Sequence, residues 1–305
     1  MTDTIGRVEQ PETDAVLAHW QAEKPRLTVL AYNMLGVWAQ AEDIVGAVGE
    51  QVFTMAPTSA AQVHNWPGFL TTLTTRRAID VLRSAQHQRT QYVGSWLPEP
   101  IDRAVLPEDA AINDSMLRLG VLHLLEELPA SSRAAYVLHH AMGYTALNIA
   151  EVLETSPGAV RQMLSRASKK LGQSPAPERE DTGLSAMLSQ IVQAIHQTDA
   201  EGVVRLLAQD AALYSDGGGK VRAAINPVFG ARRIARFLIG IERKNPGRNI
   251  FSGQVNGEPA LLFTMEGRRD VVIIDIAEGV IQRILQVSNP EKLGQVGRNW
   301  TPLPR

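Results

Sequence analysis

Basic and amide side chains recur along one side of a predicted helix near the middle of the chain. They are Arg161, Gln162, Ser165, Arg166 and Lys169. Arginine and amide groups pair with the edges of guanine and adenine in the major groove, and lysine reaches phosphate oxygens. No acidic residue interrupts the stretch 161–170. These residue types and their spacing predict a surface that contacts DNA.

The helix that carries these residues also has an apolar side. It consists of Val160, Met163, Leu164, Ala167 and Leu171. Ser156 is a suitable N-cap with Pro157 in the first turn, and Thr145 is suited to cap a shorter helix just before it. Two short helices joined by a tight turn form a helix-turn-helix. Spacing alone leaves one alternative open, a helical hairpin with a solvated basic side.

A second group of bases lies further toward the N-terminus. Arg76, Arg77, Arg83 and Arg89 are opposed by Asp80 alone, whereas 1–60 is strongly acidic. Two separate basic segments indicate contact with nucleic acid even though the formal net charge is only −2. Apolar residues at helical spacing predict helices over 31–53 and 69–89.

Composition excludes several kinds of site. The 305 residues contain no cysteine, so a disulfide framework, a Cys-ligated zinc site and a thiol nucleophile are ruled out. The stretch 1–11 lacks the pattern of a secretory signal, and no apolar run approaches the roughly 18 residues of a membrane span. We therefore expect a protein of the cytoplasm with no membrane partner.

Two segments rich in proline and charge divide the chain into domains. We expect a helical domain at 13–91, a linker at 92–112, a helix-turn-helix domain at 113–172, a linker at 173–183, a third domain at 184–293 and a tail at 294–305.

The third domain changes character along its length. Helices are predicted at 184–198 and 200–208, and β-rich runs at 260–265, 271–276 and 280–287. Helices followed by a sheet indicate an α+β fold.

The first two domains resemble two regions of extracytoplasmic-function (ECF) sigma factors. Several short segments in the middle of the chain are similar to region 4. They are Leu128 and Pro129, 133–138, Gly143 and Tyr144, Ile149 and Ala150, and 156–162. The stretches 41–45 and 67–85 are similar to the core-binding and promoter-binding helices of region 2.

Three motifs resemble those of the subgroup that carries a SnoaL-like C-terminal extension. The linker motif at 92–100 contains Trp96, Leu97, Pro98 and Glu99. The glycine motif is Asp216, Gly217, Gly218, Gly219 and Lys220. The C-terminal motif is Asn289, Pro290, Glu291, Lys292 and Leu293. The resemblance covers about 17–293, and it implies two all-α sigma domains followed by a cone-shaped α+β domain with a curved antiparallel sheet.

The resemblance also implies a function and its partners. The chain would bind the RNA polymerase core through Glu42, Asp43 and Glu50 and direct initiation at specific promoters. Region 4 would place Arg161, Gln162, Ser165, Arg166 and Lys169 in the −35 groove. Region 2 would place Arg76, Arg83 and Arg89 along the −10 backbone. The three motifs would hold an interdomain contact through which the extension regulates the sigma domains in cis.

The core-binding helix departs from the family pattern. Gly46 and Gly49 stand in its middle, and each costs about 1 kcal/mol relative to alanine. Three explanations stay open. The acidic residues suffice for a weaker contact, the helix forms only on polymerase, or the chain is a DNA- or protein-binding regulator that has lost core binding.

An enzymatic alternative assigns chemistry to the SnoaL-like pocket. Its candidate acid–base residues are His196, Asp216 and Asp275. We expect His196 to be a packing or surface residue and Asp216 to be structural, whereas Asp275 could face either side of its strand, and no two of them form a convincing acid–base pair. We therefore predict no enzyme activity, catalytic residue, metal or cofactor, and leave open an unidentified small ligand in the pocket. Lys220 is expected to pair with Glu99 or Asp102, and Trp96 to supply packing between the linker and the extension.

Overall fold

The computed structural model describes residues 10–89, 91–106, 114–171, 181–297 and 300–303. The chain forms two compact units. The helical unit comprises Met1–Gln86, Pro107–Met116 and Leu128–Lys170, and the C-terminal unit comprises His87–Leu106, Leu117–Glu127 and Leu171–Arg305. The predicted linker residues 107–112 and 173–180, and the tail residues 298–299 and 304–305, lie outside the described residues. Among those described, no helix is both long and apolar enough to cross a bilayer.

Seven α-helices are described in the helical unit. They are α1 (Gln10–Leu35), α2 (Trp38–Phe53), α3 (Pro57–Ala60), α4 (Trp66–Arg89), α6 (Ala130–Met142), α7 (Ala146–Val152) and α8 (Pro157–Leu171). The single helix predicted over 31–53 is wrong, because Gly36 adopts a left-handed φ of 70° and ends α1. The side chains of Tyr32 and Trp38 on either side of this break pack edge to face at 5.6 Å.

The two glycines of α2 have different surroundings. The helix runs through both, so its formation does not need polymerase. A Cβ atom on Gly49 would lie 2.7 Å from the ring of Trp20, whereas one on Gly46 would meet nothing within 4 Å. Gly49 therefore gives Trp20 room to pack, which explains one of the two departures from the family pattern.

The C-terminal unit contains a sheet of seven strands. They are β1 (Leu207–Asp216), β2 (Val228–Phe229), β3 (Asn249–Val255), β4 (Glu258–Met265), β5 (Arg268–Ala277), β6 (Val280–Val287) and β7 (Thr301–Pro302). Their order is β2-β1-β6-β5-β4-β3-β7. β1 and β6 pair in parallel, and the other neighbours pair antiparallel.

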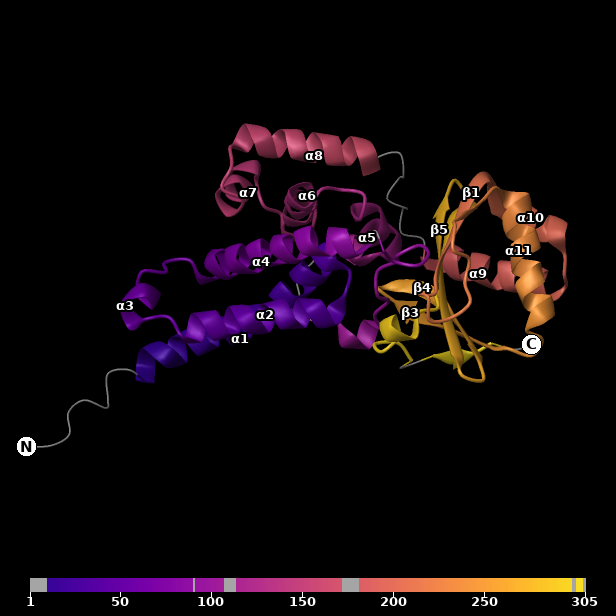
Figure 1. The fold of residues 1–305 in the computed structure, drawn as a ribbon, viewed down its shortest axis with the longest axis horizontal. Coiled ribbons are helices and arrows are strands. Elements are labelled where there is room, and N and C mark those ends of the chain that lie inside the picture. Colours follow the sequence, from indigo (N-terminus) through magenta and orange to yellow (C-terminus); the bar gives the residue numbers. More distant parts are fainter. Residues whose placement is uncertain (1–9, 90, 107–113, 172–180, 298–299, 304–305) are drawn as a thin grey trace, which may run out of the picture. The chain divides into compact units, whose positions relative to one another are not determined.

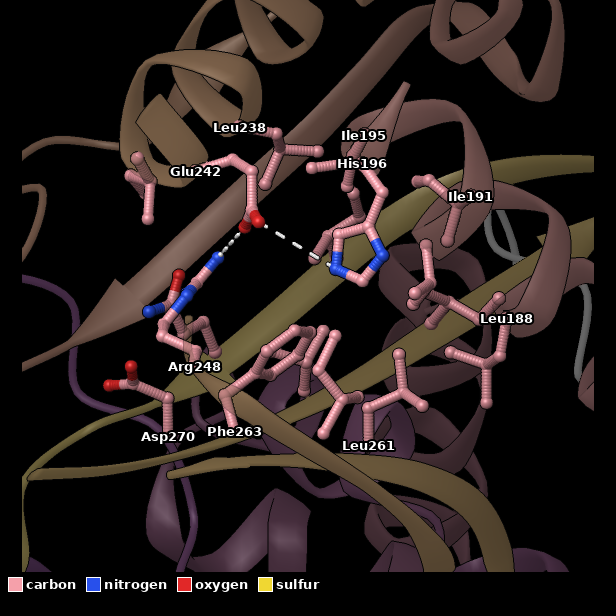
Figure 2. A pocket seen from close by; sticks show the side chains of 17 residues that line it. Leu188, Ile191, Ile195, His196, Leu238, Glu242, Arg248, Leu261, Phe263 and Asp270 are labelled. Atoms are coloured by element: carbon pink, nitrogen blue, oxygen red, sulfur yellow. Dashed lines mark hydrogen bonds and ion pairs between the residues drawn. The ribbon is translucent and has the colours of Figure 1, made fainter. Parts of the chain in front are cut away.

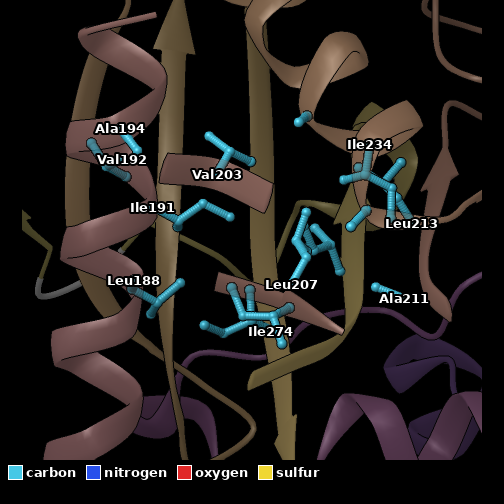
Figure 3. Close-up of a cluster of buried hydrophobic side chains, with 14 of the residues drawn as sticks. Leu188, Ile191, Val192, Ala194, Val203, Leu207, Ala211, Leu213, Ile234 and Ile274 are labelled. Atoms are coloured by element: carbon cyan, nitrogen blue, oxygen red, sulfur yellow. The ribbon is translucent and has the colours of Figure 1, made fainter. Parts of the chain in front are cut away.

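Three helices cover one face of this sheet, which we call the inner face (Figure 1). They are α9 (Asp181–His196), α10 (Ala200–Leu206) and α11 (Ala231–Lys244). Figure 3 shows part of their shared core, in which Ile191 and Val203 come from helices and Ile274 from the sheet. Strand residues alternate between the two faces, so Ile273 belongs instead to a second core on the outer face.

The outer face of the sheet is covered by segments from elsewhere in the chain. Leu97 comes from the linker, Leu119 from α5 (Leu119–Leu125), and Leu293 and Val296 from the C-terminal segment. Leu97 and Leu119 are fully buried, and burying each side chain contributes roughly 1.5–3 kcal/mol. The linker and α5 are therefore integral parts of the C-terminal unit.

Candidate functional site

The helix-turn-helix is built by α7 and α8. Thr145 and Asn148 form a reciprocal capping box at the start of α7, and Ser156 Oγ accepts a hydrogen bond from the amide of Ala159 at 3.1 Å. Both predicted caps are confirmed. Glu154 takes a left-handed φ of 52° in the turn between the helices.

The basic side of α8 is accessible in this structure. The side chains of Arg161, Gln162, Ser165, Arg166 and Lys169 are all exposed. Val160 and Ala167 on the opposite side are buried. One side of α8 thus presents hydrogen-bond donors and positive charge to solvent, while its apolar side is buried within the protein.

The bases of α4 have different partners. Arg76 donates from Nε to the carbonyl of Val152 at 3.2 Å and lies 2.9 Å from the carboxylate of Glu154, both next to the helix-turn-helix turn. Arg83 lies 3.7 Å from Asp80 on its own helix. Arg89 belongs to α4, but its side chain is outside the described part.

A second contact joins α1 to α6 within the helical unit. Arg133 is 3% exposed and donates to the carbonyl of Met34 at 2.8 Å. Burial lowers the pKa of its guanidinium to about 9. Arg76 of α4 thus contacts the turn of the helix-turn-helix, and Met34 of α1 contacts α6, the helix just before it.

The three sequence motifs of the C-terminal unit converge on one buried ion pair. Asp216 is fully buried and lies 2.7 Å from Nζ of Lys292. Its carboxylate also accepts from the hydroxyl of Tyr92 at 2.6 Å and from the amide of Leu97 at 2.9 Å. Burial, followed by the hydrogen bond to Asp216, raises the pKa of Tyr92. We call Tyr92, Leu97, Asp216 and Lys292 the linker lock.

Aromatic rings and a carbonyl complete the surroundings of Lys292. Its Nζ donates to the carbonyl of Leu97 at 2.5 Å and lies 4.0 Å from the ring centre of Trp96 and 5.0 Å from that of Tyr92. A cation over an aromatic face is attracted by the ring, more strongly when water is excluded. Trp96 therefore contributes a cation–π contact as well as packing.

The glycine motif shapes the turn beside this pair. Gly218 and Gly219 adopt left-handed φ values of 58° and 70°, which glycine accepts without steric cost. A Cβ on Gly218 would lie 2.3 Å from the side chain of Asn289, and one on Gly217 would lie 2.6 Å from the carbonyl of Val221. Gly218 therefore allows the C-terminal motif to approach closely, and Gly217 allows the chain to turn tightly back at Val221.

The expected pairing of Lys220 is wrong. Lys220 lies 2.9 Å from Glu291 and so joins the glycine motif to the C-terminal motif. Asp102 instead accepts from the amide of Gly297 and the indole of Trp300. Of the remaining motif residues, Pro98 and Glu99 are buried and Pro290 is exposed. Lys220 and Glu291 lie far apart in the sequence, so no local pattern indicates that they pair.

A second set of contacts holds α5 on the outer face of the sheet. Glu258 pairs with Arg118 and accepts from the amide of Leu119 at 3.1 Å. Asn256 accepts from the amide of Ile101 at 3.0 Å and donates to the carbonyl of Leu117 at 2.9 Å. These side chains thus provide hydrogen-bond partners for the backbone groups of Leu117 and Leu119 at the start of α5.

Comparison with known proteins identifies the helix-turn-helix and the whole chain. The family model for sigma-70 region 4 matches residues 118–171. The chain is 30% identical over 292 residues to the ECF RNA polymerase sigma factor SigJ of Mycobacterium tuberculosis, covering 90% of this chain and 92% of that protein. The chain belongs to the ECF sigma factors. A probable ECF sigma factor of the same organism, SigI, is 26% identical over 92% of this chain and 95% of its own length.

The solved structures agree with this assignment. The crystal structure of the M. tuberculosis ECF sigma factor SigJ superposes with a TM-score of 0.73 at 27% identity, covering 92% of this chain and 98% of that chain. The predicted family and fold class, helical sigma domains followed by a SnoaL-like α+β domain, are confirmed. Sigma factors bind the RNA polymerase core and promoter DNA.

The family assignment places α5 at the start of region 4. α5 is covered by the region 4 match, yet it packs on β5 and β6 inside the C-terminal unit. Gly120 allows this approach, since a Cβ there would lie 2.2 Å from the carboxylate of Asp275. Asp275 itself is buried and lies 2.8 Å from Arg283.

The sigma factor also contains an apolar chamber between its inner sheet face and helices. His196 lines this chamber, with Nε2 3.6 Å from Glu242, and Glu242 lies 2.7 Å from Arg248 (Figure 2). Glu242 and Arg248 were not predicted beside His196, because Glu242 belongs to α11, a helix that was not predicted. Its signal was present in the apolar spacing of Ile234, Leu238 and Ile241.

Proposed function

We propose that this sigma factor is regulated in cis by its C-terminal unit, which retains the linker and the first helix of region 4. One observation carries the proposal. The linker lock and α5 together cover an apolar sheet face that would otherwise face water. A sigma factor reads two promoter elements with two separate regions, so a retained linker limits how far those regions can separate.

The proposed active state releases this segment. The equilibrium is a two-state one, in which polymerase or DNA shifts the population only by binding the released state more tightly. Release exposes Leu97 and Leu119 and removes the hydrogen bonds that Tyr92 and Leu97 make with Asp216 and Lys292. The retained state is therefore the default of the free chain.

We assign the DNA contacts of the released state to the exposed bases. The side of α8 formed by Arg161, Gln162, Ser165, Arg166 and Lys169 would enter the −35 groove. Arg76, Arg83 and Arg89 on α4 would follow the −10 backbone. Arg76 must first leave Val152 and Glu154, an exposed pair of little energetic cost.

We assign contact with the polymerase core to Glu42, Asp43 and Glu50, which are exposed on α2. The buried residues of α2 include Ile44, Val45 and Val48. The helix therefore keeps its acidic residues on the side away from its own core. We assign the C-terminal unit a regulatory and not a catalytic role.

Binding of immobilised RNA polymerase core tests the proposal. The full-length chain is compared with Lys292→Met, which opens the linker lock, and with Lys220→Met as a matched control outside it. We expect Lys292→Met to bind more tightly than both others. Equal binding by all three chains would contradict regulation by the linker lock, and no binding by any of them would favour a regulator without core contact.

A further inference from the structure

A hollow with basic walls lies beside the apolar chamber in the C-terminal unit. Its volume is about 570 Å³, which falls within the range of small-molecule sites. The charged residues that line it are Arg222, Arg236, Lys244, Arg248, Arg268 and Asp270. Five bases against one acid make this concave surface strongly positive. We call it the basic hollow.

Some of these charges are already matched. Arg268 lies 3.0 Å from Asp270, and Arg248 lies 2.7 Å from Glu242. In the part of the chain that the structure describes, no carboxylate pairs with Arg222, Arg236 or Lys244. Positive charge gathered in a cleft attracts anions from solution.

Two buried polar atoms in the wall also have no hydrogen-bond partner among the described residues. They are Oγ of Ser215 and Nε of Arg248, and both residues line the hollow. Ser215 is only 1% exposed. A buried donor without a partner costs about 1–3 kcal/mol, so this wall of the hollow carries two polar atoms whose burial is not compensated.

The hollow has an apolar side as well. Phe237, Ile241 and Phe263 line it. Phe263, labelled in Figure 2, and Ile241 also line the apolar chamber. The free volume of this chamber is about 50 Å³. A ligand whose charge lies among the bases would therefore meet aromatic and aliphatic carbon at its other end.

We propose that the basic hollow binds a small organic anion, a carboxylate or phosphate ester that carries a short apolar group. The anionic head would accept hydrogen bonds from Arg236 and Lys244, and the apolar group would lie against Phe237 and Phe263. This binding site is separate from the linker lock, so it goes beyond the regulatory proposal and stands or fails by its own test.

One glycine on α11 gives a direct way to fill the hollow. Arg236, Gly240 and Lys244 are four residues apart and share one side of the helix. All three line the hollow, and a Cβ on Gly240 would meet nothing within 4 Å. A leucine at this position is therefore accommodated by the fold while it occupies space between the two bases.

Calorimetric titration of the full-length chain tests the proposal. The probes are octanoate and octyl phosphate, with inorganic phosphate and octyltrimethylammonium as comparisons, all below their micellar concentrations. We expect both amphiphilic anions to bind, inorganic phosphate to bind at least tenfold more weakly, and the cation not to bind. The ratio of octanoate to octyl phosphate affinity then assigns the head group.

The variants make the test specific to the hollow. Two variants should each weaken the binding of octanoate and octyl phosphate at least tenfold without lowering the melting temperature of the chain. They are the double variant Arg236→Gln/Lys244→Gln and the single variant Gly240→Leu. Arg243→Gln is the matched control, because Arg243 is an exposed base on the same helix that does not line the hollow. No binding of either anion at millimolar concentration, equal binding of the cation, or equal weakening by Arg243→Gln would overturn the proposal.

Discussion

The ammonium of Lys292 lies 2.7 Å from the carboxylate of Asp216, in a position where Asp216 is completely buried. The two residues are 76 positions apart, and each also binds the backbone of Leu97. This pair links the glycine motif, the C-terminal motif and the linker. Because a buried charge is stable only while it is paired, the folding of these segments is coupled.

Lys292→Met should destabilise the chain strongly. It leaves Asp216 buried without its cation, which costs about 3–5 kcal/mol. The double variant Asp216→Asn/Lys292→Met should recover part of that loss, because neither side chain is then charged. Urea unfolding measures the change. Lys220→Met is the control, since its pair with Glu291 is exposed and should contribute less than about 1 kcal/mol. A loss for Lys220→Met as large as that for Lys292→Met would contradict the coupling.

Gly120→Ala should loosen α5 from the sheet. The added Cβ would lie 2.2 Å from an oxygen of Asp275, and overpacking of this kind costs about 1–3 kcal/mol. Limited proteolysis should then cut 117–127 faster. Gly158→Ala in α8 serves as the control, because its Cβ would meet only Oγ of Ser156 at 3.8 Å. Equal protection of 117–127 in both variants would show that α5 is not held by this contact.

The two glycines of α2 should respond in opposite directions to alanine. Gly46→Ala should raise the free energy of unfolding by about 0.5–1 kcal/mol, because its Cβ meets no neighbour. Gly49→Ala should lower it, since the Cβ would clash with Trp20 at 2.7 Å. Thermal unfolding of the two variants checks the signs. Stabilisation by both would mean that Gly49 does not make room for Trp20.

The ionisation of Glu258 should make stability depend on pH. Burial raises the pKa of Glu258 from 4.5 to about 7, and the charge of Arg118 offsets only part of the rise. Between these values the folded chain holds a proton that the unfolded chain has released. The stability that this proton contributes is therefore present below about pH 4.5 and is lost as pH rises through 7.

Glu258→Gln isolates this effect. We compare the free energy of unfolding of the variant with that of the wild type, both measured in urea. The difference, variant minus wild type, should be larger at pH 8 than at pH 5. Burial and nearby positive charges lower the pKa of His123 to about 4, which gives an opposite pH dependence, but His123 is present in both chains and its effect cancels. Parallel pH profiles for the two chains would contradict the raised pKa.

The bases of α8 should divide into two classes in DNA binding. Lys169→Ala should weaken specific and non-specific DNA equally and reduce the salt slope by about 1, as expected for a phosphate contact. Arg161→Ala should cost about 1–3 kcal/mol on the specific site alone, as expected for a base contact. Fluorescence anisotropy at several salt concentrations separates the two. Unchanged affinity in both variants would exclude this side of α8 as the DNA-binding surface.

Local signals in the sequence were sufficient for the helix-turn-helix. Thr145 and Ser156 cap helices within three residues of themselves, so nothing distant is needed to predict them. The strands 260–265, 271–276 and 280–287 were also placed correctly, with small differences at their ends. Glu278 and Gly279, at the turn between the last two of these strands, adopt left-handed φ values.

Contacts between residues far apart in the sequence could not be predicted from such local signals. The lock between Lys292 and Asp216, and the contact of Asn256 with Ile101, join residues more than 70 positions apart. The helix predicted at 200–208 ends earlier, at Leu206, because Leu207 starts β1 and pairs with Ile281. The basic hollow was missed with α11, since its charge gathers only when that helix packs on the sheet.

A reversible cross-link between the linker and the sheet tests the central claim most directly. Asp102 and Val255 form an antiparallel bridge, and the amide of Asn256 donates to the carbonyl of Ile101 beside it. Such a non-hydrogen-bonded pair has Cα atoms about 4.5 Å apart, within reach of a disulfide. The chain has no cysteine of its own, so Asp102→Cys/Val255→Cys introduces one defined bond.

The measurement is the affinity of this variant for RNA polymerase core in its oxidised and reduced forms, with Asp102→Cys alone under the same oxidant as control. The account predicts that the oxidised form binds at least tenfold more weakly than the reduced form, while the control is unaffected. Equal affinity of the oxidised and reduced forms would contradict the claim that release of the linker from the C-terminal unit controls this sigma factor.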